Sequence, residues 1–172
     1  MKNCRHCSKP LIHSFVDLGF APPSNALLSP EQLNRPETYF PLRVKVCENC
    51  WLAQTEDYAD PGDLFQDDYP YFSSTSSTWV AHARAFSTEI IENLQLDDDS
   101  LAIEVASNDG YLLRNFVEAG IPCLGIEPTA GTADTAERLG IPVLREFFTE
   151  SLGIQLRSKG RQADLIIGNN VY

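Results

Sequence analysis

The chain has 172 residues, of which 43% are hydrophobic, and a formal net charge of −11 from 24 acidic and 13 basic residues. This size and composition suit one or two small globular domains with buried cores. No cluster of Lys and Arg offsets the negative charge, which disfavours a nucleic-acid partner. The N-terminus lacks the apolar stretch of a signal peptide, and no segment approaches about 18 consecutive apolar residues, which disfavours a membrane partner. We therefore expect a cytoplasmic protein.

Two Cys-x-x-Cys pairs stand far apart in the sequence, Cys4 with Cys7 and Cys47 with Cys50. Four thiolates with this spacing can close a tetrahedral zinc site, because each pair supplies one edge of the tetrahedron. The alternatives are a disulfide scaffold, which a reducing cytosol disfavours, and chance, which the matched spacing disfavours. The sequence therefore predicts a structural zinc site. The position of His6 between two ligands leaves a Cys/His exchange open.

The zinc-binding, ribbon-like module is expected over residues 1–58, before a Pro-Gly turn. Residues 59–100 hold an aromatic and Ser-rich stretch, then a helix whose apolar stripe begins at Trp79. A Ser or Thr of the stretch can cap that helix. Tyr71 has two interpretations at this point. Its chemistry alone favours packing, while its hydroxyl and ring could also reach a ligand site.

From residue 101 onward, short apolar runs alternate with helical patterns, as in an α/β fold. The expected strands are 101–105, 122–126, 141–144 and 163–167, with helices over 111–119 and 130–139 that end at glycines. Right-handed crossovers predict a parallel sheet with the strand order 3-2-1-4. Residues 101–172 therefore form the first half of a Rossmann-like domain.

The turn after the first of these strands indicates the ligand. A dinucleotide site uses Gly-x-Gly-x-x-Gly to bring bare backbone to a pyrophosphate. Here that turn contains Ala106, Asn108 and Gly110 instead, and Asp109 adds a carboxylate that disfavours an anion. Together with Glu104 it suits a ligand with positive charge and hydroxyls, such as S-adenosylmethionine. A different ligand on the same fold is the alternative.

A second acid follows the second strand of this pattern, in the pair Glu127-Pro128. An acid at the end of the second strand is placed to accept hydrogen bonds from ribose hydroxyls.

Several motifs in combination resemble the S-adenosylmethionine-dependent deoxysugar C-methyltransferases over nearly all of the chain. They are the segments 104–113, 125–128 and 163–171, the Tyr-x-Tyr-x-Ser-Ser stretch at 69–74 and the N-terminal four-cysteine module. The resemblance implies methylation of a carbon in a nucleotide-linked keto-sugar. The cofactor contacts that it implies are Glu104, Ala106, Ser107, Asn108, Asp109, Gly110, Glu127, Pro128, Asn169 and Asn170.

The resemblance also assigns Tyr71 to the sugar site, together with Tyr69 and Ser74, and makes Tyr71 the candidate catalytic residue of this chain. Family members continue with a segment that holds a histidine, the implied base, and with a sugar-binding region. We therefore expect this chain to be an N-terminal fragment that is inactive alone and that self-associates through an exposed sheet edge. The alternative is a non-catalytic zinc-ribbon binding or regulatory module with a vestigial methyltransferase half.

Overall fold

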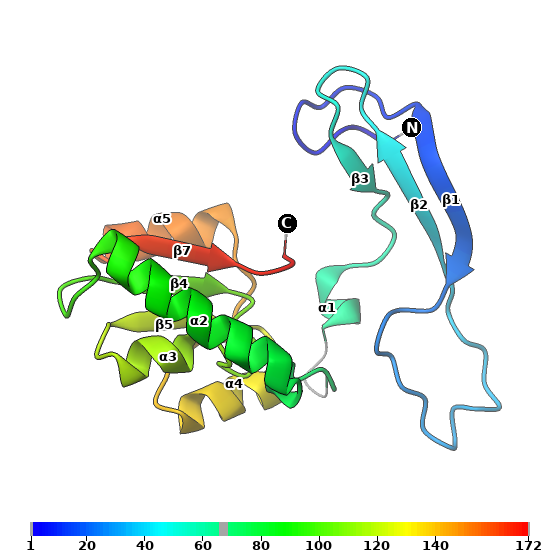
Figure 1. Cartoon of the computed structure of the whole chain (residues 1–172). Coiled ribbons are helices and arrows are strands. Elements are labelled where there is room, and N and C mark those ends of the chain that lie inside the picture. Colours follow the sequence, from blue (N-terminus) through cyan, green and yellow to red (C-terminus); the bar gives the residue numbers. More distant parts are fainter. Residues whose placement is uncertain (1, 66–68, 172) are drawn as a thin grey trace. The chain divides into compact units, whose positions relative to one another are not determined.

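The structure is a computed structural model that describes residues 2–65 and 69–171 (Figure 1). The chain forms two compact units, residues 1–64 and residues 65–172, each with its own sheet. Within the described residues, no helix is both long enough and apolar enough to cross a bilayer.

The first unit is built on an antiparallel sheet with the order β1-β2-β3. Its elements are β1 His13–Ala21, β2 Phe40–Val46, β3 Ala53–Thr55 and a short helix α1 Pro61–Leu64. A long loop, residues 22–39, joins β1 to β2 (Figure 1). Strand β2 leads directly into the second cysteine pair.

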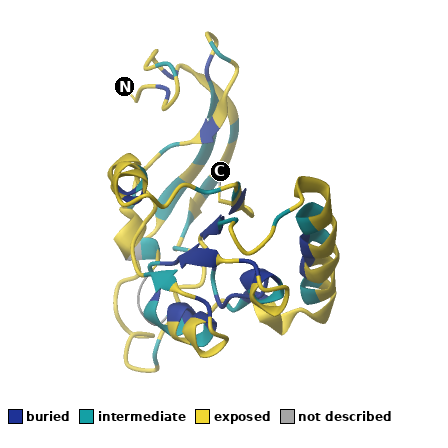
Figure 2. Ribbon diagram, turned by 90° about the vertical axis from the view of Figure 1, so that its left-hand side faces the viewer, coloured by how far each residue is buried: buried dark blue, intermediate teal, exposed yellow. Residues whose placement is uncertain are grey.

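Little of this unit is buried, and Figure 2 shows its strands mostly in the colours of exposed and intermediate residues. Its core cluster consists of Cys4, Leu11 and Cys47, with Cys7 and Cys50 packed against them. So few buried apolar side chains cannot stabilise a module of this size. The unit therefore depends on what binds its sulfur atoms.

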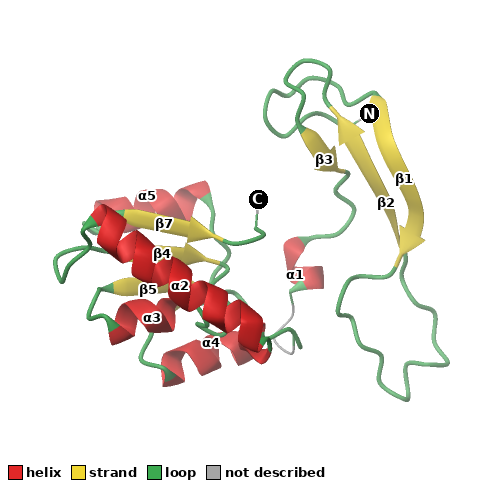
Figure 3. Ribbon diagram, viewed as in Figure 1, coloured by secondary structure: helices red, strands yellow, loops and turns green. Residues whose placement is uncertain are grey.

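The second unit contains a parallel sheet with the order β6-β5-β4-β7 (Figure 3). Its elements are η1 Ser73–Thr75, α2 Ser77–Leu94, β4 Ala102–Val105, α3 Leu113–Glu118, β5 Cys123–Ile126, α4 Ala130–Arg138, β6 Val143–Leu144, α5 Glu150–Ser158 and β7 Leu165–Gly168. Strands β4, β5, β6 and β7 are the first to fourth predicted strands, so the predicted order 3-2-1-4 is confirmed. The predicted α/β class, with a zinc module before the start of a Rossmann-like sheet, is confirmed as well.

Helices cover both faces of this sheet because neighbouring strand residues point to opposite sides. Ala102 packs with Ala83 of α2 and Phe116 of α3. The next residue, Ile103, packs with Leu152 and Leu156 of α5. In Figure 1, α2 accordingly crosses in front of the strands and α5 lies behind them.

Two local features of the second unit do not follow from the sequence pattern. Helix α5 lies where no helix is predicted, and its Leu152, Ile154 and Leu156 alternate with other residues as in a strand. The apolar stripe that begins at Trp79 extends by its spacing to Leu94, but Leu94 is 47% exposed. Gln95 adopts a left-handed conformation and ends that helix, so the chain turns and Leu96 packs on the core instead.

Two glycines let the loop after β4 pack closely against its neighbours. Gly110 has a φ of +78°, and a Cβ there would lie 2.4 Å from Ile141 Cδ1 and 3.1 Å from Ala136 Cβ. Gly125 lies in β5, and its Cβ would lie 2.5 Å from Ser107 Oγ. The loop is therefore pressed between β5 on one side and α4 and Ile141 on the other.

Gly110→Ala should lower the free energy of unfolding by about 2–5 kcal/mol. A left-handed alanine costs about 1–2 kcal/mol, and overpacking adds about 1–3 kcal/mol. Gly120→Ala is the matched control, because Gly120 has a φ of +75° but nothing within 4 Å of an added Cβ. It should lose only the conformational part, about 1–2 kcal/mol. Equal losses in chemical denaturation would contradict the close packing at Gly110.

Candidate functional site

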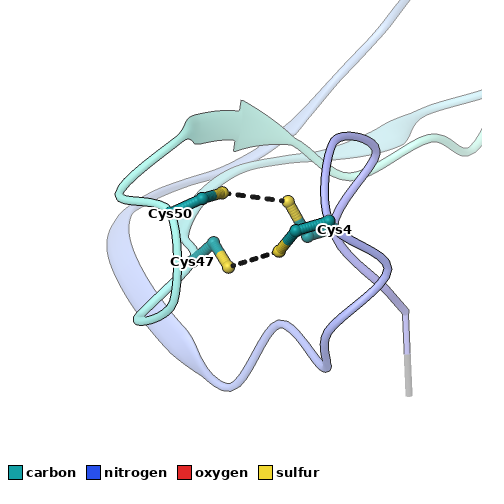
Figure 4. A group of neighbouring side chains, drawn as sticks. Cys4, Cys47 and Cys50 are labelled. Atoms are coloured by element: carbon teal, nitrogen blue, oxygen red, sulfur yellow. Dashed lines mark hydrogen bonds between the residues drawn. The ribbon is translucent and has the colours of Figure 1, made fainter.

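Two segments of the first unit bring four cysteine side chains together (Figure 4). The Sγ atoms of Cys4, Cys7, Cys47 and Cys50 all lie within 4.8 Å of one another. The Cys4–Cys50 pair is separated by 3.6 Å and the Cys7–Cys47 pair by 3.5 Å. A tetrahedron with Zn–S bonds of about 2.3 Å has edges of about 3.8 Å. The four sulfur atoms therefore fit one zinc ion.

The structure shows neither a disulfide scaffold nor a Cys/His exchange at this cluster. All four cysteines are free thiols, so they form no disulfide scaffold. His6 is exposed and lies outside the cluster, so the Cys/His exchange is not adopted.

Gln54 supports the cluster from strand β3 and was missed by the sequence analysis. Its side chain is buried; Nε2 donates to Cys4 Sγ at 3.2 Å, and Oε1 accepts from the Arg5 N–H at 3.0 Å. The backbone N–H of Cys7, followed by Gln54 and the His6 N–H, lowers the pKa of Cys4 to about 6. This favours the thiolate, which is the form that binds zinc. Nothing in the local sequence marks a strand glutamine for this role.

A second candidate site lies where the parallel strands of the second unit end. Three residues of the loop after β4 have left-handed backbones: Ala106 with a φ of 55°, Asn108 with 51° and Gly110 with 78°. Ala106 and Asn108 stand at the first two places that a dinucleotide motif fills with glycine, and Gly110 directly precedes the third. Asparagine tolerates this conformation, whereas alanine adopts it at a cost of about 1–2 kcal/mol. The loop therefore keeps a glycine-type path with only one glycine.

Glu127, directly after β5, fixes this loop through its carboxylate. Its Oε2 accepts from the Asn108 N–H at 2.9 Å. Its Oε1 accepts from the Thr129 N–H at 2.9 Å and from Thr129 Oγ1 at 2.5 Å. Pro128, between Glu127 and Thr129 in the chain, is half-buried. The ribose contact of Glu127 stays a prediction, and it would come in addition to these bonds.

Two further acids are buried beside this loop. Glu104 of β4 is fully buried, and neither carboxylate oxygen has a hydrogen-bond partner of good geometry in the described chain. Asp109 is 1% exposed; its Oδ1 has no such partner, and its Oδ2 accepts from the Ser74 N–H at 3.0 Å. Burial raises the pKa of Glu104 well above its usual range, and the charges of Asp109 and Glu127 raise it further, while the neighbouring polar groups of Asn169 and Tyr111 lower it in part.

The hydroxyl of Tyr111 belongs to this group, although the sequence analysis placed Tyr111 only at the start of a helix. Asn169, after β7, donates from Nδ2 to this hydroxyl at 3.0 Å, and the Tyr111 ring stacks on Trp79 with centroids 5.9 Å apart. Burial and the charge of Glu104 raise the pKa of Tyr111 to about 12. Asn170 follows with an exposed side chain and a left-handed backbone.

The structure brings the predicted substrate segment to the predicted cofactor loop. Tyr71 is 52% exposed, and its carbonyl oxygen accepts from Asn108 Nδ2 at 3.0 Å. Tyr69 packs on Phe65 with ring centroids 5.4 Å apart. Ser107 contributes no exposed surface, because its side chain is buried against β5. The predicted roles of these residues stay predictions.

Two comparisons with known proteins show what the sequence of this chain is similar to. Residues 4–65 match a family model, Methyltransf_13, described as a zinc binding domain. Over 169 residues, 98% of this chain, the sequence is 30% identical to the C-methyltransferase NovU of Streptomyces niveus. The chain spans 40% of the length of that curated relative. The predicted resemblance is confirmed: the chain carries a zinc-binding domain of this family in its first unit, and it is related to a C-methyltransferase over nearly all of its length.

Proposed function

We propose that this chain is part of an S-adenosylmethionine-dependent C-methyltransferase for a nucleotide-linked keto-deoxysugar, and that its second unit binds the cofactor. The observation that supports this most is the pair of buried acids, Glu104 and Asp109, with unpartnered oxygens at the end of β4. Buried carboxylates without partners are unfavourable unless a ligand completes them. A ligand with ammonium and sulfonium groups meets that requirement.

The residues of this site fit the cofactor part by part. Glu104 and Asp109 would hold its cationic methionine end, and Glu127 would accept from its ribose hydroxyls. Asn169 and Asn170 would border the same pocket from the end of β7. When bound, the cofactor supplies the methyl group. The similarity to NovU supports the carbon acceptor, and the nearness of Tyr71 to the loop supports a sugar site there.

We also propose that the zinc ion is structural. Four thiolates satisfy a tetrahedral ion and leave no open position for a substrate. The metal would supply the first unit with the stability that its small core lacks.

Cys47→Ser should release zinc, because three thiolates hold the ion far less tightly than four. The purified wild-type chain should contain close to one zinc ion, with Zn–S distances of about 2.3 Å by X-ray absorption. Amide exchange should speed up in the first unit and stay unchanged in the second. Cys123→Ser is the control, since Cys123 is a buried thiol of the second unit. A metal-free protein with a Cys4–Cys7 disulfide would contradict the proposal.

Glu104→Gln separates stability from cofactor binding. The raised pKa of Glu104 means that the folded chain retains a proton that the unfolded chain has already lost. Wild-type stability should therefore fall as the pH rises from about 4.3 toward the folded-state pKa. Glu104→Gln should remove that slope and raise the free energy of unfolding at pH 7, because the neutral amide has no proton to lose. A destabilised variant with an unchanged slope would contradict a buried, unpaired acid.

The same Glu104→Gln variant should bind S-adenosylmethionine roughly 10- to 100-fold more weakly, the scale of about 1.5–3 kcal/mol for hydrogen bonds to charged groups. Asp109→Asn should weaken binding as well, because it also removes negative charge. Wild-type affinity should rise with pH, since the cation favours the ionised Glu104. Glu127→Ala is a poorer test, because it also releases the backbone of Asn108. Absence of wild-type binding at millimolar cofactor in calorimetry would favour a non-catalytic zinc-binding module.

The 172-residue chain alone should transfer no methyl group to a sugar nucleotide and should self-associate. It spans 40% of the length of NovU, and in the described chain β7 pairs only with β4. An unpaired strand edge is a template for another chain. Ile166 of β7 is 60% exposed, so Ile166→Lys should reduce the association. Light scattering and a methyl-transfer assay on one sample check both parts, and a monomeric, active chain would contradict them.

A further inference from the structure

The side chain of Asn108 binds the backbone of the segment that carries Tyr71. Its Nδ2 donates to the Tyr71 carbonyl oxygen at 3.0 Å, and its Oδ1 accepts from the Ser73 N–H at 2.8 Å. These two backbone groups are two residues apart, so the carboxamide pairs with the segment as a residue of a neighbouring strand would. The Ser74 N–H adds a third bond, to Asp109 Oδ2 at 3.0 Å.

The backbone of Asn108 is held from the opposite direction. Its N–H donates to Glu127 Oε2 at 2.9 Å, and its φ of 51° is left-handed. Asparagine combines tolerance of that conformation with both a donor and an acceptor on a short side chain. One residue therefore links Glu127, the proposed ribose ligand, to the backbone of Tyr71 and Ser73.

Tyr71 reaches the same end of the sheet as the buried acids. Its side chain is 52% exposed, so it is available to a ligand. It also lies near enough to Tyr111 to contribute to the raised pKa of that residue. Within the segment, Thr75 Oγ1 donates to the Phe72 oxygen at 2.8 Å, whereas the two backbone bonds are longer, with Thr75 N–H to Phe72 oxygen at 3.3 Å and Ser76 N–H to Ser73 oxygen at 3.5 Å. The bonds to Asn108 and Asp109 are what join the backbone of this segment to the loop after β4.

We propose that Asn108 is a positioning residue that clamps Tyr71 at the mouth of the cofactor site and couples cofactor binding to the order of residues 71–74. The coupling rests on the proposed function. The clamp itself is a property of the free chain. A cofactor held by Glu127 and the loop would fix the Asn108 backbone, and its carboxamide would then hold Tyr71 in place for the acceptor.

Residue-resolved amide exchange, followed by NMR, tests the clamp in the free protein. Asn108→Gly keeps the left-handed backbone and removes the carboxamide. Exchange at the Ser73 N–H should speed up roughly 3- to 10-fold, the effect of one hydrogen bond, while Ser74 should change less because Asp109 still accepts from it. Asn108→Asp is the conservative variant; it retains an acceptor and should restore the protection of Ser73. Amides of β4 and β5 report whether each variant folds.

Unchanged exchange at Ser73 in a folded Asn108→Gly chain would overturn the clamp. If the amides of β4 and β5 also lose protection in Asn108→Gly, that variant has not folded, and Asn108→Asp becomes the test of the clamp. Asn108→Asp should leave the Ser73 N–H protected and shift the carbonyl resonance of Tyr71, because the Tyr71 carbonyl loses its hydrogen-bond donor. An unshifted Tyr71 carbonyl would overturn the clamp.

Saturating S-adenosylmethionine tests the coupling. It should slow exchange at Ser73 a further threefold or more in the wild type and leave it unchanged in Asn108→Gly. Equal slowing in both chains would overturn the coupling. Absence of binding to the wild type would overturn the proposed function and the coupling with it, whereas the ligand-free comparison still decides the clamp.

Discussion

The carboxylate of Glu127 holds the second unit's site together. It accepts backbone N–H groups from two segments, Asn108 of the loop after β4 and Thr129 at the start of α4. Ala106 and Asn108 hold left-handed conformations that cost free energy unless their surroundings enforce them. Because Glu127 is itself buried, its bonds form in a medium where hydrogen bonds to a charged group are strong. The hydrogen bonds of Glu127 therefore help to set the positions of Asp109 and of the Asn108 carboxamide.

Three buried acidic side chains lie together at the same place. Glu104, Asp109 and Glu127 lie close enough for the latter two to raise the pKa of Glu104. Of these three, only Glu127 has both oxygens engaged in hydrogen bonds of good geometry within the described chain. The unpartnered oxygens of the other two support the proposal that this end of the sheet binds a ligand.

The sequence predicts those features of the fold that local pattern and connection rules determine. The cysteine spacing predicts four ligands that meet, and the alternation of apolar runs with helical patterns predicts the parallel strand order. Local pattern fails where it is ambiguous, as at Leu152, Ile154 and Leu156, whose strand-like alternation lies in α5. It also fails at the end of α2, where Leu94 continues the apolar spacing but is exposed, and Gln95 turns the chain directly after it.

Contacts between distant segments were beyond the reach of the sequence. Gln54 lies 50 residues along the chain from Cys4, and Asn108 lies 37 and 35 residues from Tyr71 and Ser73, yet hydrogen bonds join each of these pairs. The residue types permit many such pairings, and only the folded chain selects one. For the same reason, the role of Glu127 toward the backbone could not be separated from its predicted role toward a ribose.

The loop over residues 22–39 has a consequence for how the first unit can vary between related proteins. The pairing of β1 with β2 fixes both ends of the loop. The two cysteine pairs, one before β1 and one after β2, come together at the other end of these strands. The entropy of loop closure grows only with the logarithm of length, so doubling this loop costs about 0.6 kcal/mol. An inserted residue between Cys47 and Cys50 would instead displace a sulfur atom from the tetrahedron. Insertions should therefore accumulate in the loop and be absent from the two cysteine turns.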